Sequence, residues 1–272
     1  MRTVRIPTAL TIAGSDSGGG AGIQADLKTF TAFRVFGLSA VTGLTAQNTQ
    51  GVQKVELPST DFIAAQLRAV LTDIGADAVK TGMLATGEII RTVAGLIREF
   101  GLTNLVVDPV MIAASGDALM QHEAAPVMRE HLFPLATVVT PNLDEATFLC
   151  QRKIRTLEEM REAARAIHAM GPRTVLVKGG HLPGDRVVDL LFDGREFVER
   201  ESPRIPGEFH GTGCTLSAAI AAGLAKGLPV REAVAIAQAY IALAIQAAPA
   251  VGKGRRPLDH VPAGFVPPET RR

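Results

Sequence analysis

The sequence His210-Gly-Thr-Gly-Cys-Thr-Leu-Ser217 decides how the rest of the chain is interpreted. Apart from Lys226, residues 215 to 227 are all small or apolar, and this composition predicts a buried helix. The glycines therefore lie where a loop becomes a helix. The first N–H groups of a helix have no intrahelical partners, and the helix dipole adds partial positive charge. We therefore interpret Gly211–Gly213 as a candidate anion-binding corner.

Cys214 lies in the same electric field, which is expected to lower the pKa of its thiol and activate it. The alternative interpretation is a glycine-capped helix start that carries a buried, inert cysteine. The eight residues alone do not separate the two, so the remainder of the chain has to.

Composition excludes several classes of protein. The chain has 272 residues, of which 47% are apolar and 20% charged, enough for a large folded core. A net charge of +1 and 4% aromatic residues give no reason to expect a nucleic-acid or anionic-membrane partner. The two cysteines form no disulfide framework or Cys-x-x-Cys metal motif. Without a signal-peptide or membrane-spanning pattern, the chain is expected to be cytoplasmic.

Strand and helix patterns alternate along almost the whole chain. Strands are predicted at 7–13, 38–45, 52–57, 78–80, 105–107, 137–139, 175–177, 187–192 and 196–198, the last two joined by a hairpin at Asp193-Gly194. Helices are predicted at 23–33, 60–74, from Thr86 to 100, 124–132, 145–150, from the capping box at Thr156 to before Gly171, 215–227 and 230–247. This order predicts a three-layer α/β fold, with a mostly parallel sheet covered by helices on both faces. No linker or repeat is visible, so residues 1–272 are interpreted as one domain with an extended tail from about Pro257.

Residues with specific chemistry collect where the strand patterns end. They are Gly14 to Asp16, Gln47, Gly82-Met83, Asp108, Asn142 and Lys178. Ligands of open α/β sheets bind beyond the carboxyl ends of the strands, so these residues are expected to meet the anion corner at one edge. The glycine-rich loop 14–22 does not have the spacing of a dinucleotide or Walker loop.

Three of these strand ends each have two interpretations. Asn142 and Glu145 share a helix face and suit a hydrated Mg²⁺ bound to phosphates, but the same spacing describes an N-cap. Asp108 either holds a Mg²⁺-bound water or bonds neighbouring backbone amides. Lys178, beside two glycines, is either a phosphate contact or a surface residue. Two histidines beside glycine motifs are further candidates for phosphate contacts: His181 and His210.

Motifs in a fixed order run from Ala13 to Gly254. The most specific are Ala13-Gly-Ser-Asp-Ser-Gly-Gly-Gly-Ala-Gly-Ile-Gln-Ala-Asp-Leu-Lys28 and the cysteine that ends His210-Gly-Thr-Gly-Cys214. Between and after them come Ala46-Gln-Asn-Thr49, Thr81-Gly-Met-Leu84, Asp108-Pro-Val-Met111, Thr140-Pro-Asn-Leu-x-Glu145, Lys178-Gly-Gly-His181 and Val251-Gly-Lys-Gly254. This series resembles the hydroxymethylpyrimidine/phosphomethylpyrimidine kinases of the ribokinase-like superfamily. The chain departs from the pattern at Ala114, where relatives often carry lysine.

The resemblance implies an ATP- and Mg²⁺-dependent kinase of thiamine biosynthesis. It would phosphorylate 4-amino-5-hydroxymethyl-2-methylpyrimidine and then convert the monophosphate to the diphosphate. The implied pyrimidine pocket consists of Gly14, Asp26, Gln47, Met83 and Val110. The implied nucleotide contacts are Asn142, Glu145, Lys178, His210 and Lys253, with Asp108 and Glu145 toward the metal. Gln47 fits its role chemically, because an amide pairs with a ring nitrogen and an exocyclic amine at once.

The corner Gly211, Thr212, Gly213 and Cys214 would then be the point of phosphoryl transfer. Related sugar and vitamin kinases carry aspartate at the position of Cys214, so its thiolate is the candidate base for the first phosphorylation. The second acceptor is an ionised phosphate and needs no base. The family also suggests a homodimer.

Two rival functions remain. A pyridoxal or pyridoxine kinase has the same fold and a similar heterocyclic substrate. A non-catalytic vitamin- or pyrimidine-binding protein would keep the fold for sensing, although the complete set of Asn142, Glu145, Lys178 and the anion corner argues against it.

Overall fold

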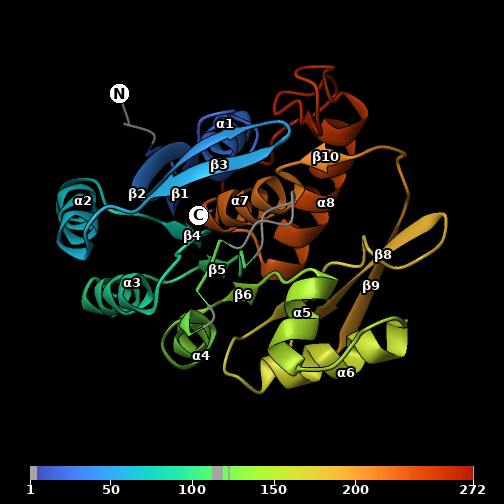
Figure 1. Cartoon of the computed structure of the whole chain (residues 1–272), viewed down its shortest axis with the longest axis horizontal. Coiled ribbons are helices and arrows are strands. Elements are labelled where there is room, and N and C mark those ends of the chain that lie inside the picture. The colour runs from blue at the N-terminus through green and yellow to red at the C-terminus, as the bar shows by residue number, and fades with distance from the viewer. Residues whose placement is uncertain (1–4, 112–118, 122, 272) are drawn as a thin grey trace.

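A nine-stranded sheet forms the centre of the molecule (Figure 1). The computed structural model describes residues 5–111, 119–121 and 123–271. The strand order is β3-β2-β1-β4-β5-β6-β7-β8-β9. The strands are β1 (Thr8–Asp16), β2 (Phe36–Asn48), β3 (Gly51–Glu56), β4 (Ala78–Thr81), β5 (Leu105–Val107), β6 (Val138–Val139), β7 (Val175–Val177), β8 (Arg186–Phe192) and β9 (Phe197–Pro203). The six neighbouring strands β2-β1-β4-β5-β6-β7 are parallel to one another. The pairs β2–β3, β7–β8 and β8–β9 are antiparallel.

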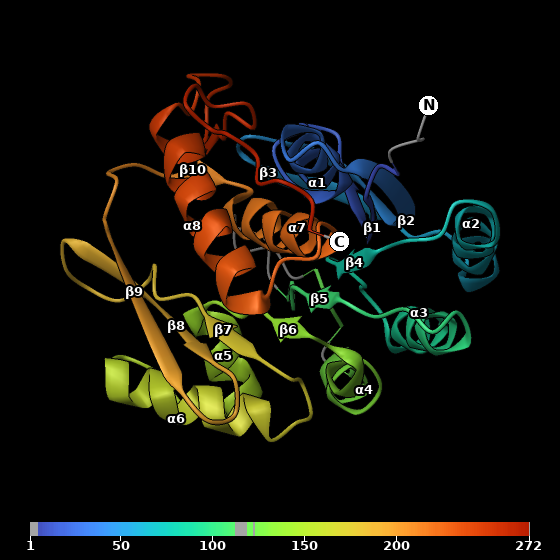
Figure 2. The same cartoon turned by 180° about the vertical axis from the view of Figure 1, so that it is seen from behind.

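Helices cover both faces of the sheet, as the sequence predicts (Figures 1 and 2). The helices are α1 (Gly22–Ala32), α2 (Thr60–Asp73), α3 (Gly87–Glu99), α4 (Ala124–His131), α5 (Leu143–Cys150), α6 (Leu157–His168), α7 (Thr212–Ala225) and α8 (Val230–Gln246), with a 3₁₀ turn at Phe133–Leu135. One apolar cluster joins the sheet to α2–α6, and a second joins its other face to α1, α7 and α8. The predicted three-layer, ribokinase-like α/β architecture is confirmed.

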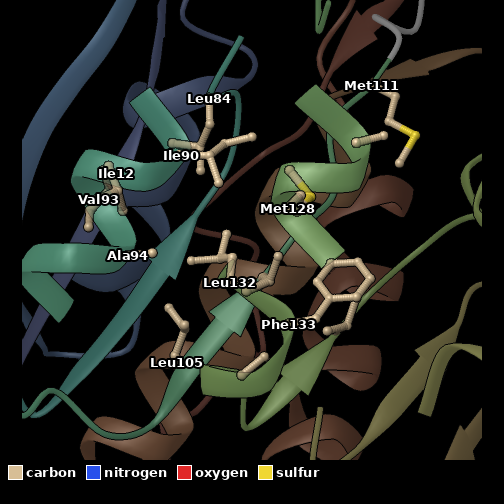
Figure 3. Packing of buried hydrophobic residues seen from close by; sticks show 14 of the residues in the cluster. Ile12, Leu84, Ile90, Val93, Ala94, Leu105, Met111, Met128, Leu132 and Phe133 are labelled. Carbon is tan, nitrogen blue, oxygen red and sulfur yellow. The ribbon is translucent and has the colours of Figure 1, made fainter. Parts of the chain in front are cut away.

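The central strands are apolar on both faces because both faces are buried. Leu105 and Val107 contribute to the cluster under α2–α6, whereas Val106, between them, belongs to the other cluster. Figure 3 shows part of the first cluster, including Leu105, Leu132 and Phe133. The predicted all-round apolar helix is α7, and its residues from Thr215 to Ala225 are all buried.

Several local signals act as expected. Thr86 caps α3 by accepting from the Ile89 amide, and Thr156 and Glu159 form both bonds of a capping box. The hairpin at Asp193-Gly194 joins β8 to β9, with Gly194 at φ +89°. In the described part of the chain, no helix combines the length and apolar character needed to cross a membrane.

The C-terminal segment differs from the predicted extended tail. Arg256–Pro257 forms a strand, β11, that pairs in parallel with β10 (Phe209–His210), directly before α7. Beyond it the backbone is irregular but packed, because the Tyr240 hydroxyl donates to the His260 carbonyl at 2.8 Å and the Phe265 ring lies 4.9 Å from that of Phe33. Sequence patterning missed this two-residue pairing, which fixes the approach to the anion corner.

Candidate active site

A cavity of about 820 Å³ opens at the carboxyl edge of the sheet and includes most of the predicted site residues. Thirteen of them line it: Gly14, Gln47, Met83, Asp108, Val110, Asn142, Glu145, Lys178, His210, Gly211, Thr212, Gly213 and Cys214. Strand ends from β1 to β7 thus meet the N-terminus of α7, as expected from a parallel sheet. Asp26 and Lys253 are not among the lining residues.

The anion corner has the backbone geometry that the two glycines predict. Gly211 is the N-cap of α7 at φ +85°, and a Cβ there would lie 1.8 Å from the Gly20 carbonyl. No side chain caps this helix, so the amides of its first turn are available to a ligand. A Cβ on Gly213 would lie 3.1 Å from the Lys178 ammonium nitrogen, so the lysine faces the corner directly.

Lys178 is held in place by Asp108. Its Nζ donates to Asp108 Oδ1 at 3.1 Å, and the same carboxylate accepts from Thr140 Oγ1 and Ser217 Oγ. Asp108 thus bonds side chains, whereas the sequence suggested backbone amides or a metal-bound water. Burial alone would lower the pKa of Lys178, but Asp108 and Glu145 together raise it, so its positive charge persists at neutral pH.

Asn142 and Glu145 form a capping box at the start of α5. The Glu145 amide donates to Asn142 Oδ1 at 2.9 Å, and the Asn142 amide donates to Glu145 Oε2 at 2.7 Å. The N-cap interpretation is therefore realised, and one carboxylate oxygen is already engaged. Burial raises the pKa of Glu145 to about 7, despite the nearby Lys178. No group of three His, Cys, Asp or Glu side chains in the described ranges is arranged to hold a metal ion.

Cys214 corrects one expectation. Its thiol is half-buried at the cavity wall. Burial raises its pKa to about 11, although Lys80 and the Gly22 amide act in the opposite direction. The helix terminus stabilises a thiolate, but desolvation outweighs it, which favours the alternative interpretation of a buried, inert cysteine. At neutral pH the sulfur in this structure carries its proton.

Asp26 corrects another. Its side chain is completely buried, with Oδ2 accepting from Lys80 Nζ at 2.8 Å and from Thr11 Oγ1 at 2.6 Å. Lys80, not Asp26, lines the cavity. The sequence contained a usable signal for this pair, because a lysine within the buried strand Ala78–Thr81 requires an acidic partner.

Both predicted phosphate-binding histidines, His181 and His210, line the cavity, whereas Lys253 does not. His210 contacts Asp16 and Gln47, whereas His181 is exposed and lies 3.0 Å from Asp144. Lys253 is exposed on a loop whose amides donate to Thr49 Oγ1. Its neighbour Arg255 lines the cavity. Ala114 lies outside the described residues.

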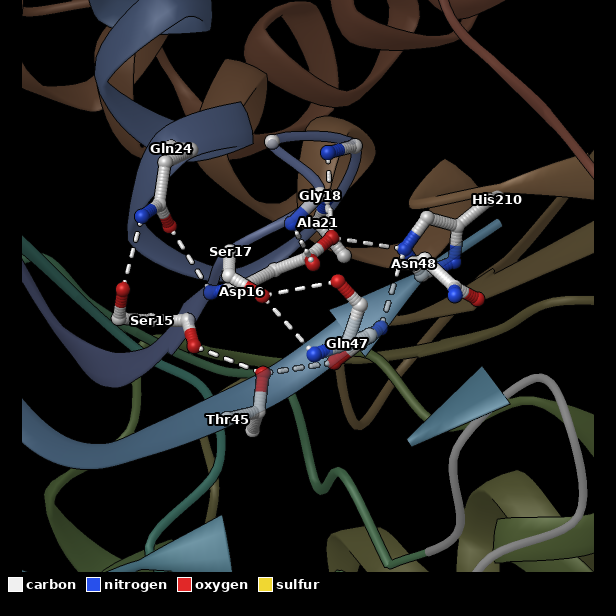
Figure 4. A network of polar contacts seen from close by, with 12 residues as sticks. Ser15, Asp16, Ser17, Gly18, Ala21, Gln24, Thr45, Gln47, Asn48 and His210 are labelled. Atoms are coloured by element: carbon white, nitrogen blue, oxygen red, sulfur yellow. Dashed lines mark hydrogen bonds and ion pairs between the residues drawn. The ribbon is translucent and has the colours of Figure 1, made fainter. Parts of the chain in front are cut away.

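Asp16, which the sequence indicates only as part of a strand end, has a role in the structure that the sequence reasoning did not assign. Its carboxylate accepts the amides of Gly18, Gly20 and Ala21, and so shapes the glycine-rich loop (Figure 4). An aspartate directly before a glycine run is a recognisable signal, because its side chain bonds backbone amides two or more residues ahead. A Cβ on Gly22 would lie 2.3 Å from the Gly14 carbonyl, which explains that glycine.

A parallel sheet between helical layers, with a cationic side chain facing a helix N-terminus in one cavity, defines a ribokinase-like small-molecule kinase. Comparisons with known proteins agree. Residues 16–259 match the family described as Phosphomethylpyrimidine kinase. The chain is 54% identical over 256 residues to the hydroxymethylpyrimidine/phosphomethylpyrimidine kinase of Rhizobium meliloti (strain 1021), covering 93% of this chain and 96% of that protein. The chain belongs to the phosphomethylpyrimidine kinase family.

Solved structures support the same fold. The phosphomethylpyrimidine kinase of Clostridium difficile 630 has a TM-score of 0.79 and 44% identity, covering 89% of this chain and all of that one. The pyridoxal kinase of Staphylococcus aureus, in complex with AMP-PCP and pyridoxal, has a TM-score of 0.89 and 36% identity, covering 97% of this chain and 96% of that one.

Proposed function

We propose that this protein uses ATP to phosphorylate 4-amino-5-hydroxymethyl-2-methylpyrimidine and then converts the monophosphate to the diphosphate for thiamine synthesis. The observation that carries the proposal is a single cavity whose lining includes Gln47, Lys178 and the corner Gly211–Cys214, although these segments are far apart in the sequence. The close relative named as a kinase of this pyrimidine and its phosphate supports the same substrates.

Phosphoryl transfer depends on position and charge more than on covalent help from the protein. In this proposal the first amides of α7 and the Lys178 ammonium group stabilise the negative charge on the phosphoryl group during its transfer. The hydroxymethyl oxygen attacks the γ-phosphorus, ADP leaves, and the hydroxyl proton passes to a base or to solvent. Cys214 is the candidate acceptor of that proton in the first step, or else shapes the corner.

Mg²⁺ is part of the proposal. A cation bound mainly by ATP oxygens and water needs only one or two protein carboxylates, and the Asp108 and Glu145 pair at the cavity wall fits that requirement. The ion would neutralise charge on the phosphates. The residues of this chain would bind and orient the nucleotide, through Lys178 and the Asn142–Glu145 end of α5.

A coupled ADP assay tests the function. We expect turnover with the pyrimidine and with its monophosphate, each strictly dependent on ATP. Pyridoxal is the informative third substrate, since the similarity to a pyridoxal kinase structure that contains pyridoxal favours it as a second candidate. Higher kcat/KM for pyridoxal than for the pyrimidine would reverse the assignment, and no ADP with any of the three would favour a binding protein.

Three broader expectations belong to the same proposal. We expect the chain to act as one kinase domain, since its sheet is continuous from β3 to β9. A homodimer and a cytoplasmic location are predictions that rest on the family. Sedimentation analysis tests the first of these and cell fractionation the second.

A further inference from the structure

Asp16, His210, Gln47 and Thr45 form a continuous series of polar contacts along one wall of the cavity (Figure 4). His210 Nε2 lies 2.8 Å from Asp16 Oδ2 and 3.2 Å from the carboxamide atom of Gln47 that is assigned as Nε2. The atom assigned as Oε1 lies 3.0 Å from Thr45 Oγ1. The Asp16 and His210 side chains are 3% and 13% exposed, so water does not substitute freely for these contacts.

The position of one proton follows from Asp16. Its Oδ2 already accepts the amides of Gly20 and Ala21, at 3.1 and 2.8 Å. Burial alone would raise the pKa of Asp16, but the hydrogen bonds from His210 and the loop amides lower it, so the carboxylate is ionised and only accepts. His210 Nε2 must therefore carry a hydrogen. That single hydrogen is shared between Asp16 Oδ2 and the Gln47 atom that faces it, so this atom is an acceptor. It is therefore the carbonyl oxygen, and the carboxamide is turned over relative to its assigned orientation.

The opposite end of the carboxamide gives the same answer independently. Thr45 Oγ1 lies 2.9 Å from the Ser15 backbone carbonyl, which can only accept, so the single hydroxyl hydrogen points there. Toward Gln47 the hydroxyl oxygen is then an acceptor, and the carboxamide must present its NH₂ group. The network thus assigns the amide orientation from both sides.

We propose that the Asp16–His210 pair and Thr45 lock the carboxamide of Gln47 in one orientation and thereby set the enzyme's choice of heterocycle. In this orientation the carbonyl oxygen keeps one free lone pair and the NH₂ group one free hydrogen. A ligand must therefore offer a donor beside an acceptor, with the donor on the His210 side. A half-buried amide that cannot rotate rejects the opposite pattern, because both hydrogen bonds become repulsive contacts.

An aminopyrimidine with an amino group at C4 and an unprotonated N3 offers this pattern. His210 immediately precedes Gly211, so the carbonyl end of Gln47 is the end next to the phosphoryl-transfer corner. C4 is likewise the ring atom next to C5, which bears the reacting hydroxymethyl group. A 4-oxo pyrimidine has the reverse pattern, with an acceptor at C4 and a hydrogen on N3. This analogue cannot rotate in the cavity to match the carboxamide without moving its hydroxyl group away from the corner. This inference rests on the proposed pyrimidine kinase function.

The test compares kcat/KM for the 4-amino substrate and its 4-oxo analogue within each variant, so that a general loss of activity cancels from the ratio. We expect the wild type to prefer the 4-amino compound by about 10²-fold or more. His210→Phe keeps a ring but removes the donor, and Thr45→Val keeps the shape but removes the acceptor. Each should lower the preference at least tenfold, mainly through KM. His210→Gln supplies an amide donor and should restore part of it.

The outcomes separate this inference from the function beneath it. An unchanged preference in both His210→Phe and Thr45→Val, with the wild type active on the 4-amino compound, refutes the lock and leaves the function intact. A wild type inactive on both compounds refutes the function and the lock together. Calorimetric binding of the two pyrimidines to the same variants provides a second readout, in which the Kd ratio should change with the kinetic ratio.

Discussion

Two lysine–aspartate pairs line or underlie the cavity, and they differ in access. Lys80 and Asp26 are joined at 2.8 Å with both side chains completely buried. Lys178 and Asp108 are joined at 3.1 Å, with 14% of the lysine side chain and 2% of the aspartate exposed. A small difference in exposure decides what each charge can do, because only Lys178 can approach a bound phosphate without leaving its partner.

The buried pair acts on its surroundings instead. Burial alone would lower the pKa of Lys80, but Asp26, Cys214 and Asp108 together raise it, so the ammonium group remains charged beneath the site. It is also the group that acts most strongly against the burial effect on the Cys214 thiol. One pair is thus placed to contact a ligand, and the other supports the fold and the electric field around the sulfur.

Lys178→Met should have the largest effect of the changes considered. We expect kcat/KM for the pyrimidine to fall by about 10³-fold or more, because the main cationic side chain that stabilises the negative charge on the phosphoryl group is removed. Steady-state kinetics at saturating ATP measure this effect. Lys54→Met, on the exposed strand β3, is the matched control and should stay near the wild type. A loss of less than about tenfold in Lys178→Met would show that the corner's amides suffice.

Lys80→Met should mainly affect stability. It leaves the Asp26 carboxylate buried without its ionic partner, which typically costs about 3–5 kcal/mol of unfolding free energy. Urea denaturation measures this cost. The double variant Lys80→Met with Asp26→Leu removes both charges and should recover most of the stability. If the double variant were no more stable than the single one, the pairing with Asp26 would not be the cause.

The contrast between the pairs also shows what sequence alone can predict. Strand ends, helix caps and the glycine corner follow from local patterns, and the structure confirms them. Which acid each lysine meets depends on how distant elements pack, which no local pattern specifies. Lys80 meets Asp26 because α1 lies against β4, and Lys178 meets Asp108 because the ends of β5 and β7 lie close together. The raised pKa of Cys214 was missed for a related reason: the helix start is visible in the sequence, but the degree of burial is a property of the assembled layers. Likewise the two-residue β10–β11 pairing, which holds His210, is too short to have a periodicity.

Glu145 sharpens the comparison because it lies beside the accessible pair. Burial raises its pKa from 4.5 to about 7. Between these values the unfolded chain has lost a proton that the native protein keeps, so this group makes stability fall as pH rises through that window. Glu145→Gln keeps the capping box but removes the titration, so its unfolding free energy relative to the wild type should rise by up to about 3 kcal/mol from pH 4.5 to 7.5.

Glu159 provides the matched control, because it occupies the same capping-box position at the exposed start of α6. Hydrogen bonds from the Arg155 and Thr156 amides lower its pKa, so it stabilises the fold above its unfolded pKa and loses that contribution as the pH falls. Glu159→Gln should therefore shift stability in the opposite direction and less, measured by the same denaturation series. Parallel behaviour of the two variants would contradict the role of burial.

Cys214→Ala bears most directly on the buried pair. A thiol with a pKa of about 11, a value that already includes the lowering effect of Lys80, is a poor base at neutral pH unless bound ligands lower it further. If Cys214 takes the proton of the hydroxymethyl group, the variant should lose about 10²-fold in kcat for the first phosphorylation and little for the second, whose acceptor is already ionised. Separate assays with the pyrimidine and its monophosphate measure the two losses.

The pH profile adds a second criterion. The wild-type rate of the first step alone should rise with pH, and that of Cys214→Ala should not. Equal losses in both steps, with no change of profile, would mean that the sulfur only shapes the corner and that the charge of Lys80 serves the fold.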